Sequence, residues 1–223
     1  MPALKSVVVP ATAKHSATVF FLHGLGDSGA GWAPVAKMLS PALPHVKWVL
    51  PNAPTRPITV NMGMPMPGWY DIQSLSPGGR EDSEGISASL SQVSQLIDEE
   101  IKAGIPADRI VLGGFSQGAA MTIVYGLCGA QKLKGLISLS GYVPLTDKHL
   151  EKMGNSANKE TEMMMGHGDE DQVVAYKWGK ASYDKLVELG KTVQPFRTYR
   201  GMAHSSSEEE IREVGAFLKK LLP

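Results

Sequence analysis

One stretch near the middle of the chain decides the fold, Ile110-Val111-Leu112-Gly113-Gly114-Phe115-Ser116-Gln117-Gly118-Ala119-Ala120. It opens with β-branched and apolar residues typical of a buried strand, and it closes with residues that favour a helix. Between them, the pattern G-x-S-x-G places glycines two residues on either side of Ser116, which allows a strand to turn sharply into a helix. Such a turn presents the serine hydroxyl in front of a helix N-terminus, where developing negative charge is favoured. The alternative is a glycine-rich turn with an incidental serine.

Short apolar runs recur along the rest of the chain, and segments with helical spacing separate them. The runs cover residues 18–22, 46–50, 110–112, 136–139, 163–165 and 193–199. Runs that are apolar nearly throughout predict strands buried on both faces, as in a parallel sheet. Helices are expected over residues 86–101 and 173–189, and after residues 205–207, where any of three serines can form a capping box with a glutamate. This alternation predicts an α/β fold, with helices on both faces of a mostly parallel central sheet.

The composition of the 223 residues is that of an ordinary globular protein, with 43% hydrophobic and 20% charged residues. We expect one domain over residues 1–223. Lys plus Arg equals Asp plus Glu at 22 each, so nothing in the charge favours nucleic acid or an anionic membrane as a partner. Cys128 is the only cysteine, which excludes intramolecular disulfides and cysteine-rich metal sites. With neither a leader nor a transmembrane run, the sequence predicts a cytoplasmic protein.

A nucleophilic serine needs a base, and the base needs an acid to orient it. After a G-x-S-x-G turn, the order along the chain is serine, acid and histidine. The histidines downstream of Ser116 are His149, His167 and His204. His204 follows the last predicted strand, so we assign it as the base. We expect His149 to lie on a solvated helix and His167 to bond its own turn.

Three carboxylates compete for the role of the acid, because Asp169, Glu170 and Asp171 all follow the predicted strand before that of His204. Asp171 lies two residues before the apolar pair that starts the next predicted helix, so we assign it as the acid. Asp169 is expected to bond backbone N–H groups of a turn, and Glu170 is expected to be solvated.

Two backbone N–H groups are expected to form an oxyanion hole, one from Gln117 and one from Leu25, which follows the first central strand. The loop 24–29 also matches the dinucleotide pattern G-x-G-x-x-G. That pattern requires an acidic residue about 20 positions further on. No Asp or Glu occurs between Asp27 and Asp71, so the cofactor interpretation fails. We expect neither a metal nor an organic cofactor.

Together these residues resemble the acyl-protein thioesterases, in the carboxylesterase and lysophospholipase-like branch of the α/β-hydrolase fold. The matching segments are His23-Gly24-Leu25-Gly26-Asp27, Pro51-Asn52-Ala53-Pro54, Trp69-Tyr70-Asp71, residues 113–118, His167-Gly168-Asp169-Glu170-Asp171 and Gly201-Met202-Ala203-His204-Ser205. The resemblance implies hydrolysis of long-chain acyl thioesters, such as palmitoyl groups, on protein cysteines. It also implies the triad and the oxyanion hole at the positions assigned above.

The resemblance implies S-acylated proteins or acyl esters as substrates. We expect no nucleic acid partner, at most peripheral and transient membrane contact, and a monomer or weak homodimer. Pro2 stands where some family members carry a lipidated cysteine, so stable anchoring by an N-terminal lipid is not expected. Two other functions stay open: a general carboxylesterase or lysophospholipase acting on shorter acyl esters, and a catalytically silent receptor that reuses the hydrolase fold.

Residues 51–79 contain many Pro and Gly residues and little periodicity, which is typical of a functional loop. Within this loop, Met62, Met64 and Met66 alternate with Gly and Pro. Unbranched thioether side chains adapt to flexible partners, so we expect these methionines to cover an acyl chain, with Trp69 as a wall of the same groove. The alternative is that they fill gaps beneath the loop.

Overall fold

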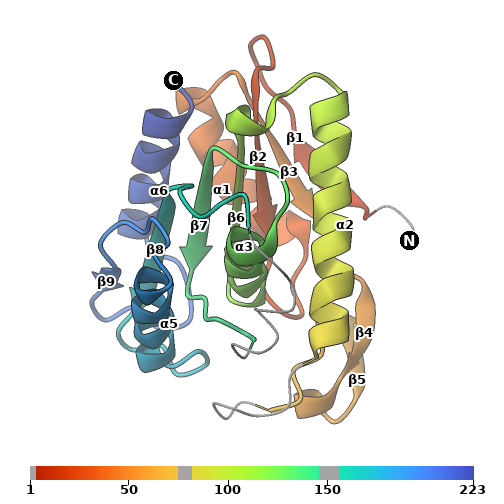
Figure 1. Ribbon diagram of the computed structural model, residues 1–223, viewed down its shortest axis with the longest axis vertical. Coiled ribbons are helices and arrows are strands. Elements are labelled where there is room, and N and C mark those ends of the chain that lie inside the picture. Colours follow the sequence, from red (N-terminus) through yellow and green to blue (C-terminus); the bar gives the residue numbers. More distant parts are fainter. Residues whose placement is uncertain (1–3, 75–81, 146–155) are drawn as a thin grey trace.

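The computed structural model describes residues 4–74, 82–145 and 156–223. Its main feature is a seven-stranded sheet with the order β1-β3-β2-β6-β7-β8-β9 (Figure 1). β1 pairs antiparallel with β3, whereas all other neighbouring strands of this sheet are parallel. The strands are β1 (Ser6–Val9), β2 (Ala17–Leu22), β3 (Val46–Pro51), β6 (Ile110–Phe115), β7 (Gly135–Leu139), β8 (Met163–Gly168) and β9 (Arg197–Tyr199). A separate hairpin pairs β4 (Thr55–Ile58) with β5 (Met64–Pro67).

The continuous apolar runs form the central strands, as predicted. Every residue of β2, β7 and β8 is buried, because helices cover both faces of the sheet. β9 is shorter than the run at 193–199. Val193 forms only an isolated bridge with Met163, and Pro195 has no N–H with which to continue the ladder.

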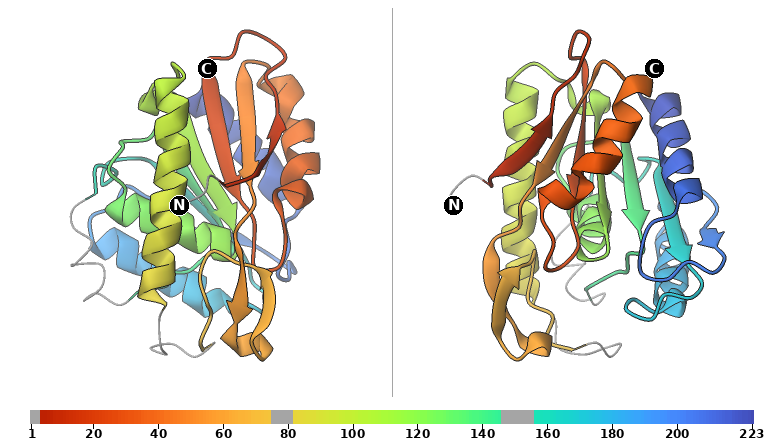
Figure 2. Two further views of the ribbon diagram at one scale, coloured as in Figure 1. Left: turned by 90° about the vertical axis from the view of Figure 1, so that its right-hand side faces the viewer. Right: turned by 180° about the vertical axis from the view of Figure 1, so that it is seen from behind.

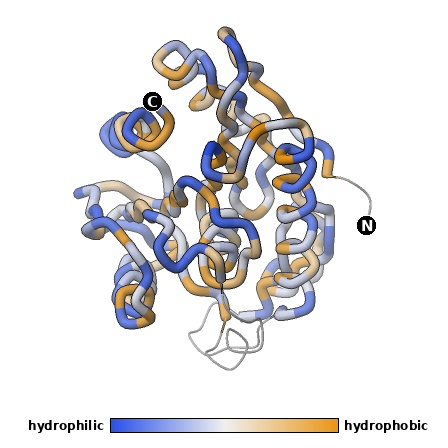
Figure 3. The backbone as a smooth tube through the Cα atoms, turned by 45° about the horizontal axis from the view of Figure 1, so that its top comes forward, coloured by the Kyte–Doolittle hydropathy of each residue, from blue (hydrophilic) through white to orange (hydrophobic). Residues whose placement is uncertain are grey.

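Helices pack on the two faces of the sheet (Figures 1 and 2), and the buried apolar residues form two separate clusters. One face carries α2 (Ser83–Lys102), α3 (Gln117–Cys128) and α5 (Tyr176–Glu188). The other carries α1 (Gly29–Leu39) and α6 (Glu208–Leu221). Short 3₁₀ turns also occur in the described part of the chain: η1 (Ser40–Ala42), η2 (Thr59–Asn61) and η3 (Ala107–Arg109). Each turn of α2 and α6 carries both hydrophobic and hydrophilic residues, as expected of helices that pack one face on a core (Figure 3).

The N-terminus of α6 selects one of the three candidate capping serines. The hydroxyl of Ser207 accepts a hydrogen bond from the N–H of Glu210 at 3.1 Å. Only this half of the capping box forms: the Glu210 carboxyl is fully buried, and neither of its oxygens has a hydrogen-bond partner among the described residues. This burial raises the pKa of Glu210 from 4.5 to about 8.

Apart from β1, the strands of the seven-stranded sheet run parallel, so their carboxyl ends lie at one edge of the sheet, toward the bottom of Figure 1. The loops that carry the predicted chemical groups therefore meet at this edge, where ligands of open α/β sheets bind. Within the described residues, none of the helices has the length and hydrophobicity that crossing a membrane requires.

Candidate active site

The turn between β6 and α3 holds Ser116 in a strained backbone conformation, with φ of 53° and ψ of −118°. Two glycines make this turn possible. A Cβ on Gly114 would lie 2.4 Å from the backbone of Gly118, and a Cβ on Gly118 would lie 2.2 Å from the carbonyl oxygen of Leu22. The structure therefore supports the mechanical interpretation of G-x-S-x-G, in which side chains at either position would collide with the backbone.

His204 lies beside Ser116 although the two residues are 88 positions apart. Nε2 of His204 is 2.9 Å from Oγ of Ser116, and Nδ1 is 2.7 Å from Oδ2 of Asp171. The ring of His204 also packs against the ring of Phe115, with centroids 4.8 Å apart. The His204 side chain is 17% exposed, whereas that of Asp171 is fully buried. The three predicted residues thus form one hydrogen-bonded line from solvent into the interior.

The Asp171 carboxylate is fixed by its own loop. Its Oδ1 accepts hydrogen bonds from the N–H groups of Val173 and Val174, both at 2.9 Å. Asp169 instead accepts a hydrogen bond from the N–H of Gly201 at 2.7 Å, so it ties the loop after β8 to the loop that carries His204. Glu170 is exposed. Of the three competing carboxylates, the structure therefore brings only Asp171 to His204.

His167 is the second histidine that the sequence singled out, and it bonds its turn as predicted. The ring is buried, and its Nε2 donates to the carbonyl oxygen of Val174 at 2.8 Å. Burial lowers the pKa of His167, so the ring is neutral. His149 lies outside the described residues.

The loop after β2 lies against the serine. A Cβ on Gly24 would be 3.3 Å from the Cβ of Ser116, so the next residue, Leu25, is close to Ser116. Among the described residues, neither the N–H of Leu25 nor that of Gln117 has a hydrogen-bond partner. Both groups are therefore free to receive the oxygen of a bound carbonyl.

His23 supports this loop, a role that sequence reasoning missed. Its Nδ1 donates to the carbonyl oxygen of Gly24 at 2.7 Å, and its Nε2 accepts from the N–H of Ala53 at 3.0 Å. The C=O of Gly24 and the N–H of Leu25 belong to one planar peptide and point in opposite directions. The hydrogen bond from His23 therefore orients the N–H of Leu25.

The predicted acyl-binding residues lie on the β4–β5 hairpin and just after it. Met62 and Met64 are 87% and 49% exposed, and Met66 is half-buried. The end of the hairpin adjoins the loop after β2, because the N–H of Gly26 donates to the carbonyl of Pro67 at 2.8 Å. Trp69 is fully buried, so in this structure it has no surface open to an acyl chain. Its indole N–H instead donates to the carbonyl of His23.

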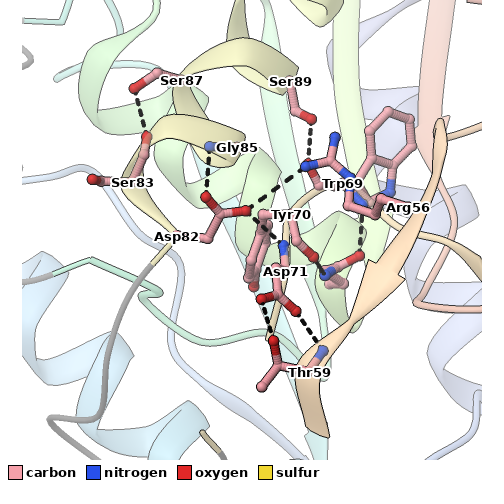
Figure 4. Close-up of polar contacts among 11 residues, drawn as sticks. Arg56, Thr59, Trp69, Tyr70, Asp71, Asp82, Ser83, Gly85, Ser87 and Ser89 are labelled. Atoms are coloured by element: carbon pink, nitrogen blue, oxygen red, sulfur yellow. Dashed lines mark hydrogen bonds and ion pairs between the residues drawn. The ribbon is translucent and has the colours of Figure 1, made fainter. Parts of the chain in front are cut away.

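Hydrogen bonds and an ion pair tie the β4–β5 hairpin to the segment before α2 and to the N-cap of α2, as Figure 4 shows. The carboxylate of Asp71 accepts from the N–H and the hydroxyl of Thr59 at 2.7 and 2.6 Å. Asp82, the N-cap of α2, accepts from the N–H of Asp71 at 2.8 Å and lies 3.7 Å from the guanidinium of Arg56. The hairpin is therefore held both at Arg56 and at Thr59, next to its turn, while Met62 and Met64 stay exposed.

The sequence profile of the family described as phospholipase/carboxylesterase matches residues 4–222. The chain belongs to this family.

Full-length relatives within the phospholipase/carboxylesterase family carry a common name. Acyl-protein thioesterase 1 of Neurospora crassa is 48% identical over 225 residues, with 97% of this chain and 91% of that protein covered. Acyl-protein thioesterase 1 of Yarrowia lipolytica is 44% identical over 224 residues, with 99% and 98% covered. The crystal structure of acyl-protein thioesterase 2 from Zea mays matches with a TM-score of 0.88 at 32% identity, over 98% of this chain and 99% of that one. These similarities confirm the predicted α/β-hydrolase fold.

Two further contacts near the site had no signal in the sequence. The side chain of Gln117 bonds the backbone of Trp69 and Tyr70, 48 and 47 residues away. The hydroxyls of Tyr70 and Tyr142 lie 2.7 Å apart and join the segment before α2 to the loop after β7. Burial raises the pKa of both phenols, so both stay protonated.

Proposed function

We propose that the protein is a serine hydrolase that removes long-chain fatty acyl groups, such as palmitoyl, from protein cysteines through an acyl-enzyme on Ser116. The observation that carries the proposal is the line of contacts from Oγ of Ser116 through His204 to Asp171, with distances of 2.9 and 2.7 Å. The name acyl-protein thioesterase, borne by relatives 44 and 48% identical over nearly the whole chain, supports the thioester as the substrate.

In the first half-reaction, Oγ of Ser116 forms a bond to the acyl carbonyl carbon while Nε2 of His204 takes the hydroxyl proton. Asp171 keeps the imidazole in the tautomer that accepts this proton and stabilises the imidazolium. The carbonyl oxygen becomes an oxyanion between the N–H groups of Leu25 and Gln117. The C–S bond then breaks, and His204 returns the proton to the leaving cysteine sulfur.

In the second half-reaction, a water molecule replaces the thiol. His204 takes a proton from this water as its oxygen bonds to the acyl carbon of the ester on Ser116. The ester bond to Oγ breaks, the proton returns to Oγ, and the fatty acid leaves. Both halves use the same groups, so no metal or organic cofactor is required.

A labelling experiment and a substrate series test this proposal together. A fluorophosphonate probe should label the wild type once per chain and should leave the Ser116→Ala variant unlabelled. The substrates are cysteine peptides S-acylated with chains from two to sixteen carbons, compared with the matching oxygen esters of serine peptides. We expect the highest kcat/KM for long-chain thioesters. Labelling without hydrolysis of any long-chain thioester would contradict the proposed substrate.

The same series separates the two alternative functions. A carboxylesterase or lysophospholipase would favour short oxygen esters or lysophospholipids over long-chain thioesters. A catalytically silent receptor would bind acyl chains but would neither react with the fluorophosphonate nor release fatty acid. The free N–H groups of Leu25 and Gln117 favour an enzyme, because a receptor has no need of donors aimed at a tetrahedral oxyanion.

We also propose that residues 1–223 work as one domain in the cytoplasm, as a monomer or weak homodimer. The match of the family profile to residues 4–222 supports the single domain. The substrates would be S-acylated proteins or acyl esters. Access to membrane-bound substrates would require only peripheral and transient contact with the membrane.

A further inference from the structure

Two imidazole rings face the same carboxylate oxygen in this site. Oδ2 of Asp171 lies 2.7 Å from Nδ1 of His204 and 3.3 Å from Nε2 of His167. The proposed mechanism uses only the first contact. His167 comes from the end of β8, and His204 comes from the loop after β9, so the two rings approach Oδ2 from neighbouring strands.

The surroundings of His167 fix its proton on Nε2. Both neighbours of Nε2, the Val174 carbonyl oxygen at 2.8 Å and Oδ2 of Asp171, are acceptors. Nδ1 is buried without a hydrogen-bond partner among the described residues, and it lies against Gly179, where a Cβ would be only 2.2 Å away. The single N–H of this ring donates to the Val174 carbonyl, and Oδ2 of Asp171 lies 3.3 Å from the same nitrogen.

An apolar ring would fill the same space without a buried, unpartnered nitrogen. The ring already lies in aromatic surroundings, edge-on to Tyr176 at 6.0 Å and beside Phe196 at 6.4 Å between centroids. The presence of histidine here is explained by what its N–H contacts, the Val174 carbonyl and the acid that faces His204.

We propose that His167 is a positioning residue for the hydrolysis: its Nε2–H shares Oδ2 of Asp171 with His204 and holds the carboxylate in the plane that orients the base. This inference rests on the proposed function, because it gives Asp171 and His204 the roles described there. Without this N–H, one anchor of Oδ2 is lost, while the bonds of Oδ1 to Val173 and Val174 remain.

The loss should also change the balance of charge. A donor to Oδ2 partly neutralises the carboxylate, so its removal leaves more negative charge facing His204. The acidic limb of the kcat/KM profile should then lie at higher pH. Among the described residues, the groups that contact His204 are Asp171, Ser116 and the apolar ring of Phe115, and the ring of Tyr176 on α5 faces His167.

The experiment compares kcat/KM against pH, on a long-chain acyl thioester, for variants that differ in this one N–H. His167→Phe removes it. In His167→Gln the amide nitrogen is three bonds from Cβ, as Nε2 of histidine is, so an N–H can face Oδ2. In His167→Asn the amide nitrogen is only two bonds from Cβ, so it falls short of Oδ2. We expect His167→Phe to lower kcat roughly 10- to 100-fold with little change in KM, and to move the acidic limb up by about half a pH unit or more. His167→Gln should restore the limb to its wild-type position.

Phe196→Leu is the matched control, because it loosens the packing on the His167 ring and leaves the N–H in place. It should reduce thermal stability and leave the acidic limb unmoved. A folded His167→Phe variant with the wild-type limb, or an equal shift in Phe196→Leu, would overturn the positioning role. If His167→Phe does not fold, the acidic limbs of His167→Gln and His167→Asn are compared instead. An acidic limb that is displaced in His167→Asn but not in His167→Gln supports the positioning role. Identical limbs in the two variants overturn it. A wild type without hydrolysis or fluorophosphonate labelling would overturn the proposed function itself, and this role with it.

Discussion

The side-chain oxygen of Gln117 accepts a hydrogen bond from the backbone N–H of Trp69 at 2.8 Å. Its amide nitrogen donates to the carbonyl of Tyr70 at 2.7 Å, so the residue that follows Ser116 also fixes the segment before α2. Gln117→Ala leaves both buried backbone groups without partners but keeps the backbone N–H of the proposed oxyanion hole. We expect the free energy of unfolding, measured in urea, to fall by about 2–4 kcal/mol. The kcat of the folded variant should fall less than tenfold, and a loss as large as that of Ser116→Ala would contradict this division of roles.

Ser116→Ala and His204→Ala should each remove nearly all turnover of an acyl thioester and leave the circular dichroism spectrum unchanged. The reason is that each residue acts only through the other across the 2.9 Å contact. The double variant should therefore lose little more activity than either single variant. Losses that add up in free energy would indicate that the two residues act independently.

Asp171→Asn should lower kcat by about 10⁴-fold. An amide NH₂ at the position of Oδ2 would face the nitrogen of His204 and favour the tautomer that cannot accept the proton of Ser116. Asp169→Asn is the matched control, because it removes the same charge two residues away and keeps an oxygen for the N–H of Gly201. Its kcat should stay within a few-fold of the wild type. A reversed ranking of the two variants would show that the acid is Asp169.

Replacing Met62, Met64 and Met66 together by Ser should lower activity on long-chain thioesters far more than on acetyl or butyryl esters. Each buried CH₂ of an acyl chain contributes about 0.8 kcal/mol, so lost cover affects long chains most. Since Met62 and Met64 are 87% and 49% exposed, thermal stability should hardly change. Met38→Ser, at a methionine of α1 that is 59% exposed, should change neither property. An equal loss of activity on both chain lengths would indicate that the three methionines serve only in packing of the hairpin.

Glu210 should make the protein less stable as the pH rises. The unfolded chain releases this proton near pH 4.5, whereas the folded state holds it to about pH 8. The folded state therefore binds more protons across this window, and the free energy of unfolding is largest below it and falls by up to about 1.4 kcal/mol per pH unit within it. At pH 8, Glu210→Gln should be about 2–4 kcal/mol more stable than the wild type, with the difference vanishing near pH 5. Glu208→Gln, at an exposed residue of the same turn, should follow the wild type at every pH in urea unfolding.

The central strands and the elbow of Ser116 could be predicted because their signals are local. Strands covered on both faces are apolar throughout. The G-x-S-x-G turn needs its two glycines because a side chain on Gly114 would collide with the backbone of Gly118, and one on Gly118 with the backbone of Leu22. His204 could be assigned in the same way, since it directly follows a strand whose carboxyl end must lie at the edge of the sheet.

The remaining features depend on contacts that no linear pattern contains. The β4–β5 hairpin has Pro57 opposite Pro65, and proline normally argues against a strand. β1 is a short antiparallel edge strand with Val8 half exposed, so it lacks the apolar signature of the centre. The approach of His167 to Asp171 depends on which way a buried ring turns, and spacing along the chain does not determine that.

One consequence follows from the place of His204 after β9, a strand of three residues at the rim of the sheet. Ser116 is carried by β6 in the centre, with partners on both sides, whereas β9 pairs only with β8. Short edge segments open at lower free energy than central ones. On warming, His204 should therefore separate from Ser116 before the helices melt, so that activity is lost while the circular dichroism spectrum is still that of the folded protein.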